Sequence, residues 1–250
     1  MDTGLNLEYE GPVVVAEIAN PPENEFTQAM CRRLADALNS PPAQSRIMLL
    51  KSVGPNFCGG RVSAGTDPLS VRSLAHSLAE VNAALVSSRL IVVCQVGGDA
   101  TGFGFGLVGL SDVSIVSRDA IFKFPEVNGG LAPALVLSWL PHVVGRRQAF
   151  WLTATAAEVD SAAALDLGLV NFVGAPDEIG RISKEVVDRL LSKGERVLGE
   201  IKSDLRSQQW LAVREDGFAA AERLAMRSLL RGPTGSQSRL DKGDLRRERI

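Results

Sequence analysis

A single carboxylate stands between an expected strand and two glycines in the stretch Phe122-Lys123-Phe124-Pro125-Glu126-Val127-Asn128-Gly129-Gly130. Taken alone, a Pro-Glu pair at such a place is typical of a solvated turn. Glu126 becomes a candidate general base because two glycine-rich loops precede it in the chain, and their chemistry calls for a base beside them.

The two loops are GPNFCGGR (residues 54–61) and GGDATGFGFG (residues 97–106), and each follows an expected strand. Glycine permits tight turns, and backbone amides at the start of a helix point together toward negative charge. Facing each other, the loops could each donate one N–H to a single developing oxyanion. The proton next to a thioester is too weakly acidic for a carboxylate such as Glu126 unless the enolate oxygen is stabilised in this way.

Residues 104–109 also match the GxGxxG pattern of dinucleotide-binding sites. A Rossmann unit needs a full crossover helix after these glycines, and here only about two turns separate Gly104 from Asp112. The spacing therefore speaks against a dinucleotide site.

Strands and helices are expected to alternate along most of the chain, with Thr27 as the N-cap of the first helix. This order predicts an α/β fold with parallel strand pairing and helices packed on the sheet. The expected strands are residues 5–9, 13–19, 47–53, 90–96, 113–117, 121–124 and 168–170, and the expected helices are residues 27–38, 74–85, 177–191 and about 195–230.

Composition favours a globular protein that binds a small molecule. The 250 residues are 45% hydrophobic and carry a net charge of -2, which gives no reason to expect a nucleic-acid or membrane partner. Three widely spaced cysteines indicate neither a disulfide framework nor a zinc site. No signal peptide or membrane-length apolar run is recognisable, so a cytoplasmic location is expected.

The order of the motifs resembles that of the crotonase superfamily, the enoyl-CoA hydratase/isomerase family, from about residue 5 to residue 230. The order of these motifs is the specific part of the resemblance. The similar segments are residues 20–27 (first acyl-CoA-contacting turn), 57–60 (Phe-Cys-Ala-Gly loop), 98–106 (second glycine loop), 122–130 (Phe-x-x-Pro-Glu-x-x-x-Gly), 141–146 and 164–170.

The resemblance implies an α/β crotonase-like ββα spiral with a helical C-terminal trimerisation region, and hence a homotrimer or hexamer. Residues 1–190 would form the acyl-CoA-binding core and residues 191–231 the helical C-terminal region. Residues 232–250, which are rich in turn formers and charge, are expected from their composition to form a mobile tail and depart from the family's usual ending. Aromatic residues in helical segments, among them Trp139, Phe150 and Trp151, are expected to pack in a core or a subunit interface.

By the same resemblance, Glu126 is the expected catalytic residue, and the backbone N–H groups of Arg61 and Phe103 form the oxyanion hole. Phe103 stands where glycine is usual. The remaining expected substrate-binding positions are Glu25, Gly59, Gly60, Gly102, Gly104, Pro125 and Gly129.

Two expected carboxylates are missing. The second glutamate of many hydratases would fall at Gly106, and the acid of related dienoyl isomerases and dehalogenases at Ala134. What remains resembles the single-glutamate enoyl-CoA isomerases, which act on an acyl-CoA thioester without a metal or redox cofactor. A hydratase or hydrolase with its water-activating group elsewhere, and a non-catalytic acyl-CoA-binding protein, remain open alternatives.

Overall fold

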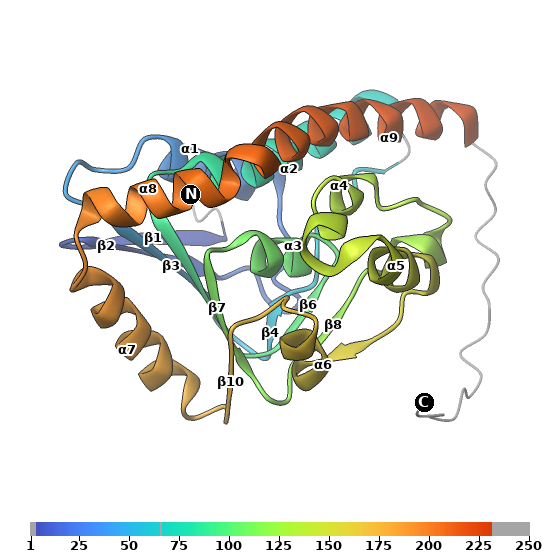
Figure 1. The fold of residues 1–250 in the computed structure, drawn as a ribbon. Helices are drawn as coiled ribbons and strands as arrows, with labels where there is room; N and C mark the ends of the chain where they lie inside the picture. The colour runs from blue at the N-terminus through green and yellow to red at the C-terminus, as the bar shows by residue number, and fades with distance from the viewer. Residues whose placement is uncertain (1–3, 66, 232–250) are drawn as a thin grey trace.

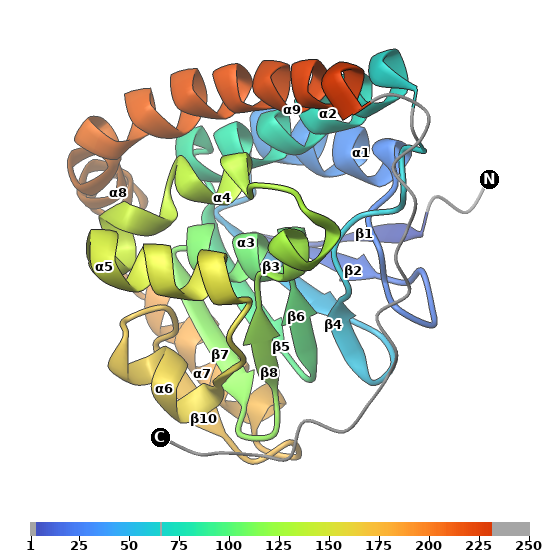
Figure 2. The ribbon, with the colours of Figure 1, turned by 90° about the vertical axis from the view of Figure 1, so that its right-hand side faces the viewer.

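The computed structural model describes residues 4–65 and 67–231, which form two β-sheets surrounded by helices (Figure 1, Figure 2). The strands are β1 (Leu5–Glu10), β2 (Val13–Ile18), β3 (Ile47–Ser52), β4 (Asn56–Cys58), β5 (Ile91–Val96), β6 (Asp99–Thr101), β7 (Val113–Ser117), β8 (Ile121–Lys123), β9 (Val159–Asp160) and β10 (Phe172–Gly174). The helices are α1 (Gln28–Asn39), α2 (Pro68–Ser87), α3 (Phe103–Leu110), the 3₁₀ turn η1 (Pro125–Gly129), α4 (Ala134–Leu137), α5 (Leu140–Thr155), α6 (Ser161–Asp166), α7 (Ile179–Leu191), α8 (Glu195–Leu211), the π turn η2 (Ala212–Asp216) and α9 (Gly217–Arg231).

The larger sheet has the strand order β1-β2-β3-β5-β7-β10. Its β1–β2 pair is an antiparallel hairpin with Leu5 opposite Ile18, and its other neighbours pair in parallel. The smaller sheet, β4-β6-β8-β9, joins β4 to β6 and β6 to β8 in parallel. The predicted α/β fold with parallel pairing is confirmed, and the smaller sheet brings both glycine loops beside the Pro-Glu segment.

Several expected elements lie where the sequence places them. Thr27 caps α1, since its Oγ1 accepts a hydrogen bond from the Met30 N–H at 3.1 Å. The long C-terminal helix is instead two helices, α8 and α9, separated by the π turn η2.

The prediction of a strand at residues 168–170 is wrong, because the chain turns there. The strand β10 comes later and pairs with β7. Gly168 has a φ of +71°, which is left-handed and incompatible with an extended strand. Leu169 and Val170 are buried in the core, so they resemble a strand in sequence without forming one.

The C-terminal helices pack against the core. Helix α9 lies along α2, which in turn packs on α1 (Figure 2). Helix α8 is tied to the larger sheet by buried charges, since Lys202 and Arg206 contact the two carboxylate oxygens of Asp112 at 2.7 and 2.8 Å. Asp112 Oδ2 also accepts a hydrogen bond from the Val92 N–H of β5 at 2.8 Å, so these contacts join α8 to the larger sheet.

The aromatic residues of the α5 region divide into two groups. Trp139, just before α5, is 2% exposed and packs edge-on against Phe124, which confirms the expected core packing. Phe150 and Trp151 are 73% and 56% exposed, and their expected role in a subunit interface stays a prediction. In the described parts of the chain, no helix combines the length and the apolar character needed to cross a bilayer.

The loops approach each other so closely at Gly98 that a side chain there has no room. A Cβ at Gly98 would lie 1.7 Å from the Pro55 carbonyl oxygen, whereas one at Gly97 would make an ordinary 3.7 Å contact with Ile179. We expect Gly98→Ala to lower the free energy of unfolding by about 1–3 kcal/mol or more, because the backbone must shift. Gly97→Ala is the matched control, with an expected change within about 0.5 kcal/mol. Urea unfolding checks both variants, and equal stabilities would contradict the close approach.

Candidate active site

The second glycine loop ends at the N-terminus of α3. Gly102 is the N-cap, with φ 52° and ψ −117°, and its N–H donates to the Lys123 carbonyl at 2.9 Å, so the loop is held against β8. Within the described residues, no acceptor faces the next backbone N–H, that of Phe103. The first N–H groups of a helix carry partial positive charge, so this amide is suited to bind an oxyanion.

The first glycine loop is held in place by Phe26. The Phe26 N–H donates to the Gly60 carbonyl at 2.9 Å, and the Val62 N–H donates to the Phe26 carbonyl at 3.0 Å. The Arg61 N–H between them has no acceptor in the described part of the chain. The Thr101 hydroxyl donates to the Gly59 carbonyl at 2.8 Å. The two loops therefore lie side by side, each with one unoccupied N–H group.

Glu126 lies on η1, directly after β8, and its carboxylate packs on Gly102. A Cβ at Gly102 would lie 3.1 Å from Glu126 Oε1, so the glycine leaves room for the carboxylate as well as allowing the positive φ. Glu126 Oε2 is buried and has no hydrogen-bond partner among the described residues. Burial raises the pKa of Glu126, and its own backbone N–H and the positive charge of Arg61 offset part of that rise.

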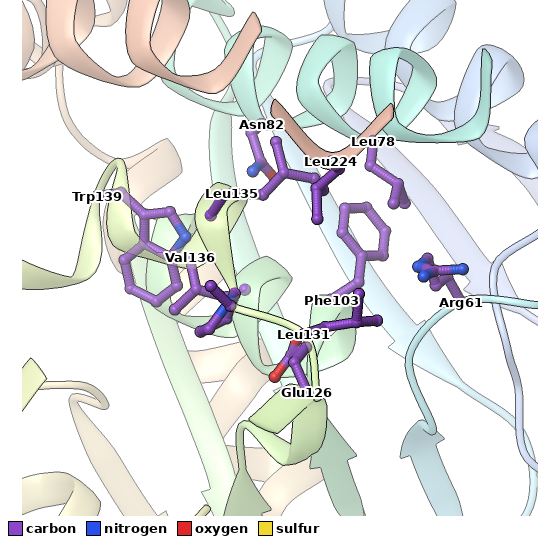
Figure 3. Close-up of a pocket in the computed structure, with 14 residues that line it drawn as sticks. Arg61, Leu78, Asn82, Phe103, Glu126, Leu131, Leu135, Val136, Trp139 and Leu224 are labelled. Carbon is purple, nitrogen blue, oxygen red and sulfur yellow. The ribbon is translucent and has the colours of Figure 1, made fainter. Parts of the chain in front are cut away.

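These groups line one pocket, which is otherwise largely apolar (Figure 3). Glu126 is the only carboxylate among the described residues that line it. Gly106 and Ala134, the positions of the missing carboxylates, line it as well. The full lining is Arg61, Leu78, Asn82, Phe103, Gly106, Glu126, Leu131, Ala132, Pro133, Ala134, Leu135, Val136, Trp139 and Leu224.

The other expected binding residues surround the pocket without lining it. The charge of Glu25 acts on Arg61, and Gly59 is bound through its N–H to the Glu23 carbonyl at 2.7 Å. Gly129, at the end of η1, is exposed and lies outside the pocket lining. The remaining four expected binding residues lie where the two loops contact each other or Glu126. They are Gly60, Gly102, Gly104 and Pro125.

Two side chains of types that often act in catalysis, Cys58 and His76, are poorly placed to react in this pocket. Burial raises the pKa of the Cys58 thiol to about 12, so it is protonated at neutral pH. His76 contacts Glu222 at 2.7 Å and takes no part in the pocket lining. Across residues 4–65 and 67–231, no three His, Cys, Asp or Glu side chains gather as metal ligands would.

A family model described as enoyl-CoA hydratase/isomerase matches residues 8–229. The chain belongs to this family. The crotonase superfamily predicted from the order of the motifs is thereby confirmed, and with it the crotonase-like fold.

Relatives within the enoyl-CoA hydratase/isomerase family are named for different activities. The chain is 32% identical over 209 residues to the Mycobacterium tuberculosis "(7aS)-7a-methyl-1,5-dioxo-2,3,5,6,7,7a-hexahydro-1H-indene-carboxyl-CoA hydrolase", covering 78% of this chain and 81% of that protein. It is 31% identical over 202 residues to the crotonyl-CoA hydratase of Syntrophomonas wolfei, covering 76% of each. A solved structure of a putative enoyl-CoA hydratase from Thermobifida fusca in complex with CoA superposes with a TM-score of 0.75 at 27% identity, covering 91% of this chain and 93% of the other.

The pocket of this family member includes side chains outside the predicted site. Arg61 was expected to act through its backbone, yet its side chain lines the pocket too. Asn82 and Leu224 come from helices far from the motifs. Asn82 could have been found, because it falls four residues after Leu78 on the buried face of the expected helix.

The charge of Arg61 affects the pH dependence of any reaction in which Glu126 takes a proton, because it offsets part of the rise that burial causes in the Glu126 pKa. Such activity falls as the pH drops through the Glu126 pKa, which the Arg61 charge lowers. We expect Arg61→Met to raise that pKa and move the acidic limb of the kcat/KM profile to higher pH, while the backbone amide is kept. Lys123→Met, which removes a cation paired with exposed Glu158, is the control. An acidic limb that stays in place in Arg61→Met would contradict the coupling.

Proposed function

We propose that this protein is an enoyl-CoA isomerase, which moves the double bond of a 3-enoyl-CoA thioester to the 2-position. The proposal rests on one observation about the pocket. Glu126 is the single carboxylate among the described residues lining an apolar pocket that also contains two residues with unoccupied backbone N–H groups.

The reaction needs one base and one oxyanion site. Glu126 would take a proton from C2, and the resulting enolate oxygen would accept hydrogen bonds from the N–H groups of Arg61 and Phe103. The protonated Glu126 would then return the proton to C4, so the double bond moves and the carboxylate is restored. No water and no second acid enter this sequence of steps.

The environment of Glu126 suits both halves of the reaction. A carboxylic acid with an ordinary pKa gives up its proton readily but is a weak base. Burial raises the pKa of Glu126, which strengthens the carboxylate as a base and keeps the proton available for C4. The largely apolar lining of the pocket is the physical source of that shift.

Water addition is less well supported by the pocket. A Cβ at Gly106 would make only an ordinary 3.9 Å contact with Trp139, so the position has room for the start of a side chain but supplies no carboxylate. Ala134 is equally unable to hold or activate water. The observations support an isomerase more strongly than a hydratase with two acids.

A hydratase or hydrolase is the second candidate, because two relatives above 30% identity are named a hydrolase and a hydratase. In that case Glu126 would activate water, and Arg61 or Asn82 would have to orient it, since these are the other polar side chains of the pocket. A protein that binds acyl-CoA without turnover is the third.

Product analysis separates the three. Purified protein incubated with 3-enoyl-CoA thioesters is expected to yield 2-enoyl-CoA alone, measured by chromatography and mass spectrometry. A 3-hydroxyacyl-CoA or a free acid as the main product would favour the second candidate. Binding of the thioesters with no product from any of them would favour the third.

A further inference from the structure

Asn82 is a buried amide whose oxygen has no partner in the part of the chain that the structure describes. The residue is 3% exposed and lies on α2. Within the described residues, its buried Oδ1 has no hydrogen-bond partner. The same side chain lines the pocket that contains Glu126.

Such an amide is costly to keep unless something binds to it. Buried polar side chains nearly always have hydrogen-bond partners, because an unpaired one loses its hydration without replacement. An apolar residue of similar volume, such as leucine, would fill the site without that cost. Ser77 on the same helix shows the usual arrangement, since its hydroxyl donates to the Ser73 carbonyl at 3.1 Å.

The amide lies far from the proposed base. Figure 3 shows Asn82 projecting from α2 into the pocket beside Leu135 and Leu224, with Glu126 at the opposite side of the view. A group held at its thioester end by Glu126 and the two amides would therefore direct its distal part toward Asn82. Apart from Asn82 itself and the indole N–H of Trp139, the side chains around this end are apolar.

We propose that Asn82 recognises an oxygen substituent, a hydroxyl or a keto group, on the distal part of the acyl chain. The inference rests on the proposed function only in taking this pocket as the acyl site. A hydroxyl would donate to Oδ1 and could accept from Nδ2, whereas a keto oxygen would accept from Nδ2. Only the hydroxyl pairs the buried Oδ1, and neither group brings a charge into this end of the pocket.

Binding of saturated acyl-CoA thioesters tests the proposed role of Asn82 without any turnover. The probes are matched thioesters of short and medium chain length in three forms, namely plain hydrocarbon, terminal hydroxyl and keto. Calorimetry with the full chain is expected to give a Kd about tenfold lower for an oxygenated thioester than for its hydrocarbon counterpart. The comparison of the hydroxyl and keto forms identifies which of the two Asn82 prefers.

Variants then assign the preference to the amide. In Asn82→Leu the hydrocarbon thioester is expected to bind as well as or better than in the wild type, and the preference for oxygen should disappear. Ser77→Ala, which removes a buried hydroxyl of α2 outside the pocket, should keep the preference.

Two results would overturn the proposal. Equal binding of oxygenated and hydrocarbon thioesters by the wild-type protein would mean that water or nothing satisfies Asn82, and this readout needs no variant to fold. A preference that survives in Asn82→Leu would place its origin elsewhere. Isomerisation of 3-enoyl-CoA is measured separately, so a failure of the proposed reaction leaves the binding result readable.

Discussion

Glu126→Gln is expected to lower kcat/KM for isomerisation of 3-enoyl-CoA by about 1,000-fold, while thioester binding is kept. A general base or acid contributes typically about 10²–10⁴-fold, and here one residue would perform both proton transfers. Glutamine preserves the shape of the side chain beside Gly102 and removes only the ability to take and return a proton. Steady-state kinetics with a chromatographic product assay measures the loss, and calorimetry measures the binding.

The stability of Glu126→Gln provides an independent readout. The folded protein raises the pKa of Glu126, so ionisation of this residue costs stability above the unfolded-state pKa of about 4.3. The variant should therefore be at least as stable as the wild type at pH 7, and the difference should shrink as the pH falls toward 4. Glu158→Gln, a neutralisation on the surface, should change the rate by less than about twofold. Full isomerisation by Glu126→Gln would exclude Glu126 as the base.

Phe103→Pro is expected to lower kcat/KM by about 10²–10³-fold relative to Phe103→Ala. Removing one oxyanion donor costs that much in well-studied acyl-transfer sites. Proline lacks the N–H group but is tolerated at the first position of a helix, which Phe103 occupies in α3. The pair of variants thus differs in the amide and shares the loss of the aromatic ring.

The alanine variant is the control for the ring, which packs edge-on against Phe26 with centroids 5.2 Å apart. Any loss common to both variants reports this packing, and the additional loss in Phe103→Pro reports the amide. Thermal unfolding of both variants shows whether α3 is intact. Similar kcat/KM values for two folded variants would mean that the Phe103 N–H does not hold the enolate.

The order of motifs in the sequence was sufficient to predict the fold and the environment of Glu126. A Cβ at Gly98 would collide with the Pro55 backbone, and one at Gly102 would press on the Glu126 carboxylate, so these two glycines report tertiary contacts directly. Apolar runs in the sequence are less specific indicators of local structure. The segment ending in Leu169 and Val170 has the composition of a strand, and only the left-handed Gly168 shows that the chain turns there.

The far wall of the pocket could not be predicted in the same way. Leu224 and Asn82 belong to helices without motifs, and their place in the pocket depends on how α9 packs along α2. Helical periodicity identifies a buried face but not the space that this face encloses. The side chain of Arg61 could not be predicted as part of the pocket, because the motif assigns a role only to the backbone of this residue.

The position of Leu224 also bears on how this pocket comes into being during synthesis. The ribosome releases the chain from its N-terminus, so Glu126 emerges about ninety residues, and both glycine loops more than about a hundred residues, before the helix that closes the pocket above them. Until α9 has docked on α2, the apolar face of α2 lacks its cover and the acyl site lacks a wall. A ribosome-bound fragment that ends before α9 would therefore carry every proposed catalytic group and still have no closed site for a substrate.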